Sequence, residues 1–152
     1  MSRRPARSRL PHSSTPSHNP SCPCGLAETY EMCCGRFLPQ SRTSSTGGTP
    51  TGAASAPTAE ALMRSRYSAF VKRDEAYLLR TWHPRTRPPR VEFEPGMRWT
   101  GLEILDTGDG TAFHTTGTVT FRASFKGGAL HERSRFERVD GAWMYVDGEF
   151  LD

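Results

Sequence analysis

Four cysteines carry the clearest chemistry in this chain of 152 residues. All of them fall within thirteen residues, in the pattern C-x-C-x8-C-C, as Cys22, Cys24, Cys33 and Cys34. Four thiolates form a complete tetrahedral ligand set for one Zn²⁺. Because they leave no open position for water, such a zinc is structural rather than catalytic. Two disulfides, or four thiols without a shared role, are the competing interpretations.

The spacing of the cysteines also constrains their backbone. Cys22 and Cys24 can face one point across a tight turn, in which Pro23 fixes the bend. Neighbouring residues on a strand point to opposite faces, so Cys33 and Cys34 can share a metal only from a turn or from the start of a helix. The sequence therefore predicts a short helical turn over residues 28–37.

The cysteine segment and three later stretches resemble a known family. The segment CPCGLAETYEMCCG is similar to the SEC-C motif, a small zinc-binding module best known from the tail of the bacterial preprotein translocation motor. The stretches TAEALMRSRYSAFVKRDEAYLLRTWHP, WTGL and WMYVDG resemble the YchJ-type family. This resemblance runs from Cys22 to Gly148. It implies a SEC-C segment followed by a domain like nuclear transport factor 2, and it implies no established activity.

One part of the motif departs from the family pattern. The small, basic Gly-Ser-Gly-Lys-type turn that usually follows the first cysteine pair is Gly-Leu-Ala-Glu here, at residues 25–28. The ligands are kept, but the change weakens the inference of a basic contact surface on the cysteine-containing segment, residues 21–38, which we call the knuckle.

Charge and composition divide the chain into two parts. Residues 1–57 hold six arginines and two glutamates, a net charge of +4, whereas residues 58–152 hold fourteen basic and fourteen acidic residues. Residues 1–20 contain four arginines, several prolines and no acid, which predicts a disordered basic tail. This tail either makes weak contacts with nucleic acid or stays solvated. Residues 39–57, rich in Ser, Thr, Gly, Ala and Pro, predict a flexible linker, so knuckle and domain are expected to fold independently.

The sequence contains no candidate membrane segment. No stretch approaches the roughly 18 to 20 apolar residues that a membrane span requires, and the N-terminus lacks the apolar run of a secretory signal. We therefore expect a cytoplasmic protein.

Residues 58–152 predict helices followed by strands. Thr58 is a helix N-cap, and an apolar stripe at helical spacing follows at Ala59, Met63, Tyr67 and Phe70. A second short helix begins near Asp74 and ends before Pro84. Strand-like runs at 98–106, 111–125, 130–139 and 142–147 are separated by glycine-containing turns. This order predicts an α+β fold, and the resemblance implies the nuclear transport factor 2-like cone, in which a curved antiparallel sheet wraps around the helices.

Such cones often enclose a pocket, and a few residues are candidates to line it. Arg66 falls inside the apolar arc of the first helix, where a charge usually needs a partner. Glu132 and Asp147 lie in strands with large apolar neighbours at alternating positions, so we consider a buried pair between Arg66 and either carboxylate. The alternative is that Arg66 extends along the helix edge to solvent.

Three further residues complete the candidate pocket. His83, at the end of the second helix, is the histidine best placed for acid–base chemistry, although a histidine before proline more often packs or caps. Trp99, like Trp143 and Tyr145, either stacks on a ligand or fills the core. Tyr67, of the apolar stripe, is the remaining candidate. No matched nucleophile or second histidine with evident spacing accompanies His83.

Two classes of function follow from these features. In the first, the protein is an interaction or adaptor module whose knuckle docks a protein or ribosome-associated partner. In the second, it is a small-molecule enzyme or ligand carrier that uses the cone cavity. The missing catalytic constellation and the SEC-C resemblance favour the first.

Overall fold

The computed structural model describes residues 21–38 and 54–151. The predicted disordered tail, 1–20, and residues 39–53 of the predicted linker lie outside this range. Two short 3-10 turns, η1 and η2, come first, followed by two helices and four strands. Their bounds are η1 Tyr30–Met32, η2 Cys34–Arg36, α1 Ala59–Lys72, α2 Glu75–Arg80, β1 Trp99–Asp109, β2 Thr116–Phe125, β3 Gly128–Val139 and β4 Ala142–Phe150.

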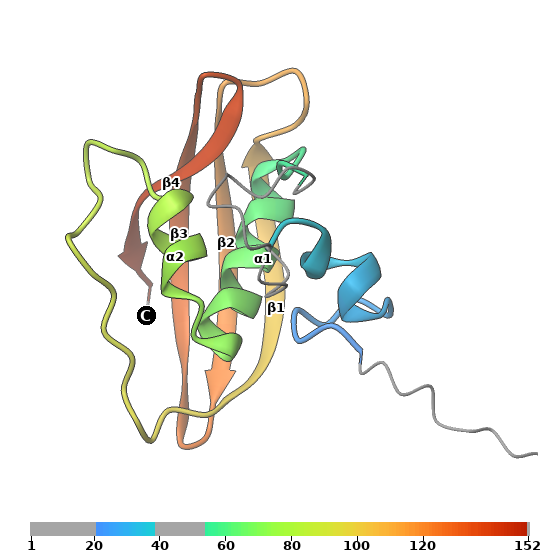
Figure 1. The fold of residues 1–152 in the computed structure, drawn as a ribbon, viewed down its shortest axis with the longest axis vertical. Coiled ribbons are helices and arrows are strands. Elements are labelled where there is room, and N and C mark those ends of the chain that lie inside the picture. The colour runs from blue at the N-terminus through green and yellow to red at the C-terminus, as the bar shows by residue number, and fades with distance from the viewer. Residues whose placement is uncertain (1–20, 39–53, 152) are drawn as a thin grey trace, which may run out of the picture.

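The four strands form one antiparallel meander with helices on one face. The strand order is β1-β2-β3-β4, and Figure 1 shows α1 and α2 lying side by side across the same side of the sheet. The predicted turn between β3 and β4 is formed by Asp140 and Gly141, whose φ angles of 52° and 84° suit a tight hairpin. The predicted α+β architecture is therefore confirmed.

Both helices begin as the sequence predicts. The N–H of Ala61 donates to Thr58 Oγ1 at 3.0 Å, and that of Tyr77 donates to Asp74 Oδ1 at 3.0 Å. These side chains satisfy backbone donors that have no partner within the helix. The predicted apolar stripe of α1 faces the sheet: Ala59, Met63 and Tyr67 are buried, and Phe70 is half-buried.

Strand β2 is apolar on the face that the helices cover. Val119, Phe121 and Ala123 are buried, whereas Arg122 between them is exposed. Thr120 is the exception to this alternation, since it is buried on the outer face, where Arg133 Nε donates to its Oγ1 at 3.4 Å.

Each strand has a boundary that differs from the predicted one. β1 ends at Asp109 rather than at residue 106, and β3 begins at Gly128 rather than at residue 130. β2 begins at Thr116 rather than at residue 111, because the preceding residues form a turn held by Arg138. The guanidinium of Arg138 donates to the carbonyl oxygens of His114 at 2.8 Å, Ala112 at 3.3 Å and Thr111 at 3.4 Å. β4 continues to Phe150, beyond the predicted end at residue 147.

The knuckle packs against helix α1 instead of standing apart from the domain. Its cysteines, with Phe37 and Leu38, belong to the same buried cluster as the helix residues. Arg64 Nη1 donates to the Cys24 carbonyl at 2.9 Å, and Arg80 Nη2 donates to the Phe37 carbonyl at 3.3 Å. Knuckle and domain thus share one core, which differs from the independent folding that we expected from the linker.

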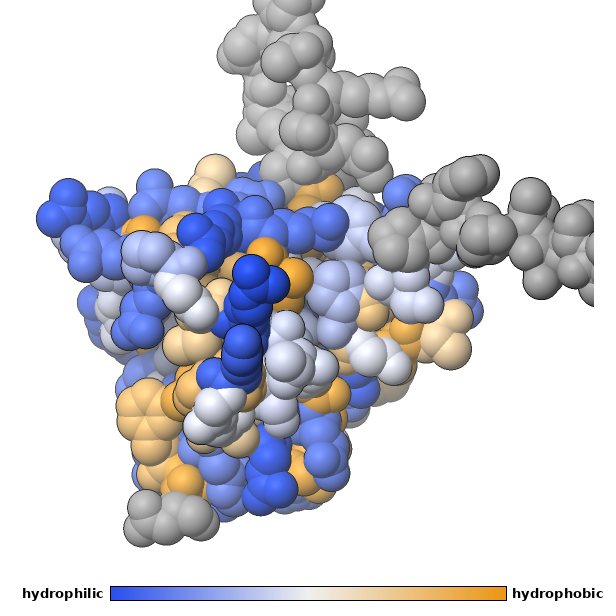
Figure 2. Space-filling view, turned by 90° about the horizontal axis from the view of Figure 1, so that it is seen from below, coloured by the Kyte–Doolittle hydropathy of each residue, from blue (hydrophilic) through white to orange (hydrophobic). Residues whose placement is uncertain are grey.

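Within residues 21–38 and 54–151, the helices are too short or too polar to cross a membrane. The lower end of the molecule, seen in Figure 2, shows hydrophobic side chains only in patches between hydrophilic ones.

Candidate metal centre and cavity

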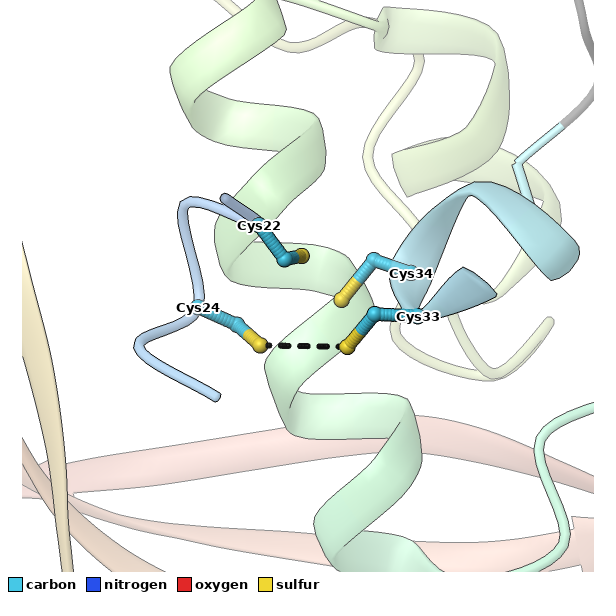
Figure 3. A group of neighbouring side chains, drawn as sticks. All are labelled: Cys22, Cys24, Cys33 and Cys34. Atoms are coloured by element: carbon cyan, nitrogen blue, oxygen red, sulfur yellow. Dashed lines mark hydrogen bonds between the residues drawn. The ribbon is translucent and has the colours of Figure 1, made fainter. Parts of the chain in front are cut away.

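The four cysteine thiols gather at one point beside α1. Figure 3 shows that the side chains converge from two segments of the knuckle. All four Sγ atoms lie within 4.8 Å of one another, and those of Cys24 and Cys33 are 3.5 Å apart. All four cysteines are free, so the two-disulfide interpretation does not apply. A tetrahedral zinc with Zn–S bonds of about 2.3 Å needs sulfurs about 3.8 Å apart. The cluster therefore has dimensions that suit one such ion.

Backbone hydrogen bonds of the knuckle hold the cysteines in this arrangement. The N–H of Cys22 donates to the Glu28 carbonyl at 2.9 Å, and that of Gly25 donates to the Cys22 carbonyl at 3.2 Å. Gly25 has φ 94°, a conformation that glycine adopts without strain. On the other side, Cys33 and Cys34 lie where η1 meets η2, so both thiols leave a helical turn, as predicted.

The surroundings of the thiols disfavour four negative charges in the absence of a cation. All four side chains are buried, and Ser68 Oγ of α1 lies 3.6 Å from Cys22 Sγ. Hydrogen bonds with Cys24 and Cys34 lower the pKa of Cys22, whereas the hydrogen bond with Cys22 raises the pKa of Cys34. A metal that binds all four thiolates must therefore displace protons from the cluster.

A separate cavity of about 210 Å³ lies between α1 and the sheet. Most of its lining is aromatic or aliphatic, and three side chains bring polar groups into it. The apolar and aromatic residues are Met63, Tyr67, Phe70, Trp82, Trp99, Phe121, Ala123, Leu130, Tyr145 and Phe150, and the polar ones are Arg66, Glu132 and Ser134.

Arg66 enters the cavity from α1 and is buried, with 3% of its surface exposed. Its Nη1 donates to the carbonyl of Leu78 at 2.8 Å and to Thr81 Oγ1 at 2.7 Å, at the end of α2. Its guanidinium carbon lies 4.6 Å from the centre of the Tyr145 ring and 5.0 Å from that of Trp82. No carboxylate of the described residues lies within ion-pair distance of Arg66, so the predicted pair with Glu132 or Asp147 is wrong. The alternative, a side chain that reaches solvent, is also wrong, because Arg66 is buried.

Glu132 faces the cavity from β3 and is held by its neighbours. Its Oε2 accepts a hydrogen bond from Ser134 Oγ at 3.2 Å. Its other oxygen lies against Gly148 of β4, where a Cβ would meet the carboxyl group. Burial raises the pKa of Glu132, an effect that Ser134 and Arg66 oppose.

The indole of Trp82 supplies a further polar atom. Its Nε1 is buried and has no hydrogen-bond partner among the described residues. The indole packs edge-on against Tyr145, with ring centres 5.1 Å apart. The backbone around it is fixed by two bonds to Tyr145, whose N–H donates to Thr81 O at 2.8 Å and whose carbonyl accepts from His83 N–H at 2.7 Å.

Of the six candidate pocket residues, four line this cavity: Arg66, Tyr67, Trp99 and Glu132. His83 and Asp147 do not. The ring of His83 caps a turn, since its Nδ1 accepts from the Arg85 N–H at 3.0 Å.

Asp147 lies on the other face of the sheet because of an irregularity in β4. Tyr145 pairs with Phe136 and Asp147 pairs with Arg135, so Val146 is an extra residue between two successive pairs. Such a bulge reverses the alternation of faces. Asp147 therefore forms an ion pair with the exposed Arg135, and this pairing lowers its pKa.

The sequence interpretation missed several residues of the cavity, among them Trp82 and Ser134. Ser134 lies two residues after Glu132 on the same strand, so its side chain points to the same face and could have been predicted to line the cavity. Trp82 lies after α2 and outside the helices and strands, so the hydrophobic pattern of the sequence did not indicate that its indole lines the cavity.

Fold and site together define a class of protein: a domain like nuclear transport factor 2 with a SEC-C-like cysteine cluster packed on its first helix. The family model described as "YchJ, middle NTF2-like domain" matches residues 58–148. The chain therefore belongs to the YchJ family.

Bacterial relatives match most of the chain. A UPF0225 protein of Streptomyces coelicolor is 73% identical over 133 residues, which cover 88% of this chain and 98% of the relative. A UPF0225 protein of Streptomyces avermitilis is 65% identical and covers 95% of this chain and 96% of the relative.

Two solved structures have a similar fold. The solution structure of a SEC-C motif containing protein from Rhodopseudomonas palustris has a TM-score of 0.67 and 32% identity, over 86% of this chain and 98% of that one. The crystal structure of a SEC-C motif containing protein from Psychrobacter arcticus has a TM-score of 0.59 and 27% identity, over 86% and 80% of the two chains.

Proposed function

We propose that this protein binds a small organic molecule in the cavity between α1 and the sheet, and that a structural Zn²⁺ in the cysteine cluster holds the knuckle on the domain. The observation that carries the proposal is the cavity itself, about 210 Å³ in volume and lined by aromatic rings with a few convergent polar groups. Concave apolar sites with this kind of lining are typical of small-molecule sites.

The cavity supports binding better than catalysis. Its described lining contains no histidine or cysteine, and its one serine, Ser134, donates to a carboxyl group rather than to a base. An activated nucleophile needs an adjacent base that a third group orients. We therefore favour a carrier or sensor of a small molecule over an enzyme.

For the metal, the four close thiols and the SEC-C motif of the similar structures support zinc. Four thiolates would close the coordination shell, so the ion would have a structural role. A cytoplasmic location, where thiols stay reduced, suits such a site.

Native mass spectrometry of protein purified without chelator tests both parts. The expected result is one Zn²⁺ together with an additional small-molecule mass. Ala123→Leu, which fills part of the cavity, should remove the additional mass and keep the zinc, whereas Ala129→Leu, at an exposed position of β3, should keep both. Absence of zinc would overturn the metal assignment, and an additional mass that both variants retain would place the ligand elsewhere.

A second candidate function, docking of a protein or ribosome-associated partner by the knuckle, has one observation in its favour. Two apolar side chains of the knuckle are exposed, Met32 by 64% and Leu26 by 41%. Cosedimentation with ribosomes that is lost in Leu26→Ser and Met32→Ser, but kept in the control Leu105→Ser on β1, would support it. Binding that falls steeply with salt would instead point to nucleic-acid contacts of the arginines in residues 1–20.

A further inference from the structure

The cavity contains a buried positive charge that lacks a negative partner. Arg66 is 3% exposed, and no carboxylate oxygen of the described residues lies within 4.0 Å of its guanidinium. A carbonyl, a hydroxyl and two ring faces contact it instead. Burial lowers the pKa of Arg66 to about 10, which leaves it charged at neutral pH. Since a buried charge without a counter-ion is costly, an anion in the cavity would relieve this cost.

A hydrogen-bond donor that lacks an acceptor lies in the side chain next to this charge. The Trp82 ring is within 5.0 Å of the Arg66 guanidinium, and its Nε1 is buried without an acceptor. Buried N–H groups are almost always paired, so an unpaired one beside a cavity indicates that an acceptor is supplied by something else. Arg66 and Trp82, which both line the cavity, thus place a charged donor and an unpaired neutral donor in neighbouring side chains.

Glu132 does not supply the missing negative partner. Its carboxyl group lines the same cavity but bonds to Ser134, and it forms no ion pair with Arg66. Burial raises its pKa, an effect that the Ser134 hydrogen bond and the Arg66 charge oppose.

We propose that the ligand is an organic monocarboxylate with a single ring or a body of similar size. Its carboxylate would bind Arg66 and Trp82 Nε1, and its apolar body would lie among Tyr67, Trp99 and Phe121. One guanidinium matches one negative charge, and the cavity volume of about 210 Å³ leaves room for one ring with a short chain. This inference rests on the proposed ligand-binding function and names its chemical class.

A matched pair of probes tests the inference on the full chain. The two compounds, 3-phenylpropionate and 3-phenylpropan-1-ol, differ in the carboxylate and share the ring. Titrations are followed by the indole N–H resonances of the three tryptophans. Trp82 should shift with 3-phenylpropionate, whereas Trp143, whose Nε1 already donates to the Pro57 carbonyl at 3.2 Å, serves as the internal control. We expect the carboxylate to bind at least about tenfold more tightly than the alcohol.

Two variants separate the roles of the donors. Arg66→Met should remove the preference for the carboxylate, so that the two probes bind this variant with similar affinities. Because loss of Arg66 can also disturb the end of α2, Trp82→Phe provides an independent test that keeps an aromatic ring and removes only the donor. It should weaken binding of 3-phenylpropionate about threefold or more, with a smaller effect on the alcohol.

The outcomes distinguish this inference from the function on which it rests. Equal affinities of the two probes for the unmodified protein would overturn the carboxylate assignment and leave the cavity as an apolar binding site. A preference that persists in both variants would show that the anion binds elsewhere, which also overturns it. If neither probe binds at millimolar concentrations, the binding function of the cavity fails as well.

Discussion

Glu132 is the residue whose surroundings most clearly predict how the stability of the protein depends on pH. Its carboxyl group lies in a cavity lined mainly by rings, with Arg66 of α1 and with Tyr145 and Asp147 of β4 as the ionisable groups that act on it. Burial is the largest influence and raises the pKa of Glu132 above its ordinary value of about 4.3. The folded protein therefore holds this proton to higher pH than the unfolded chain does.

This raised pKa predicts a loss of stability as the pH increases. Between the unfolded pKa and the raised folded pKa, the folded state binds more protons, so the free energy of unfolding falls with increasing pH and then levels off. Glu132→Gln should abolish this part of the dependence. Urea unfolding from pH 4 to pH 8 measures it, with Glu103→Gln, an exposed carboxylate on β1, as the control. Parallel stability profiles for Glu132→Gln and the unmodified protein would contradict the prediction.

Arg64 is the side chain of α1 that bonds directly to the knuckle backbone. It also pairs with Glu60 at 3.0 Å, one turn away on the helix. We expect Arg64→Met to weaken docking of the knuckle by about 1.5 to 3 kcal/mol, the range for a hydrogen bond that involves a charged group. Faster amide exchange of Cys22 and Gly25 would report this change. Glu60→Gln is the control, because it removes the surface ion pair and keeps the bond from Arg64 to Cys24. Amide exchange of Cys22 and Gly25 should be nearly unchanged in this variant. Equal acceleration in both variants would refute the role of Arg64.

At the scale of elements, the knuckle and α1 depend on each other. Phe37 and Leu38 are buried together with Leu62 and Tyr67, so the apolar face of the helix is partly covered by the cysteine segment. A metal that orders the knuckle would then also stabilise the helix against which it packs.

Loss of the metal should therefore lower the thermal midpoint of the whole chain. We expect Cys34→Ser, or a strong chelator, to reduce it by about 5 °C or more, since a loss of 1 kcal/mol shifts the midpoint of a chain of this size by roughly 2 to 4 °C and loss of a structural metal removes several kcal/mol. Circular dichroism of the helices and strands measures the shift. Met32→Ala, at an exposed position of the knuckle, is the control. An unchanged transition in Cys34→Ser would restore the picture of two independent units.

The elements themselves could be read largely from local patterns. The helical stripe, the caps at Thr58 and Asp74 and the turn at Asp140–Gly141 are set by residues close in sequence. Cysteine spacing likewise indicated that Cys33 and Cys34 leave a helical turn.

What the sequence did not show depends on contacts between distant residues. The bulge at Val146, which moves Asp147 to the outer face, follows from the register of β3 and β4. Arg66 donates to the Leu78 carbonyl of α2 and to the hydroxyl of Thr81, which follows α2, whereas the sequence left open a carboxylate partner and a side chain extended to solvent. Docking of the knuckle joins residues forty positions apart, as in the bond from Arg64 to Cys24.

At the scale of the whole molecule, the outer face of the sheet, which the helices do not cover, carries several ion pairs. Arg133 pairs with Glu149 at 3.1 Å, Arg85 pairs with Glu137 at 3.0 Å, and Arg135 pairs with Asp147. The face that does not carry the helices is therefore occupied by ion pairs and threonines in its described part, and it offers no broad apolar patch.

This charged face predicts that the protein does not dimerise through its sheet. Association there would have to desolvate several ion pairs, at a cost that their mutual attraction offsets only with excellent geometry. We expect a monomer of 16.9 kDa at micromolar concentration in sedimentation equilibrium, at both low and high salt. If a dimer forms instead, Arg133→Ala and Arg135→Ala locate it. If these variants dissociate the dimer, the charged face is the interface and the prediction is contradicted. If the dimer persists in both variants, it uses another surface and leaves this face exposed.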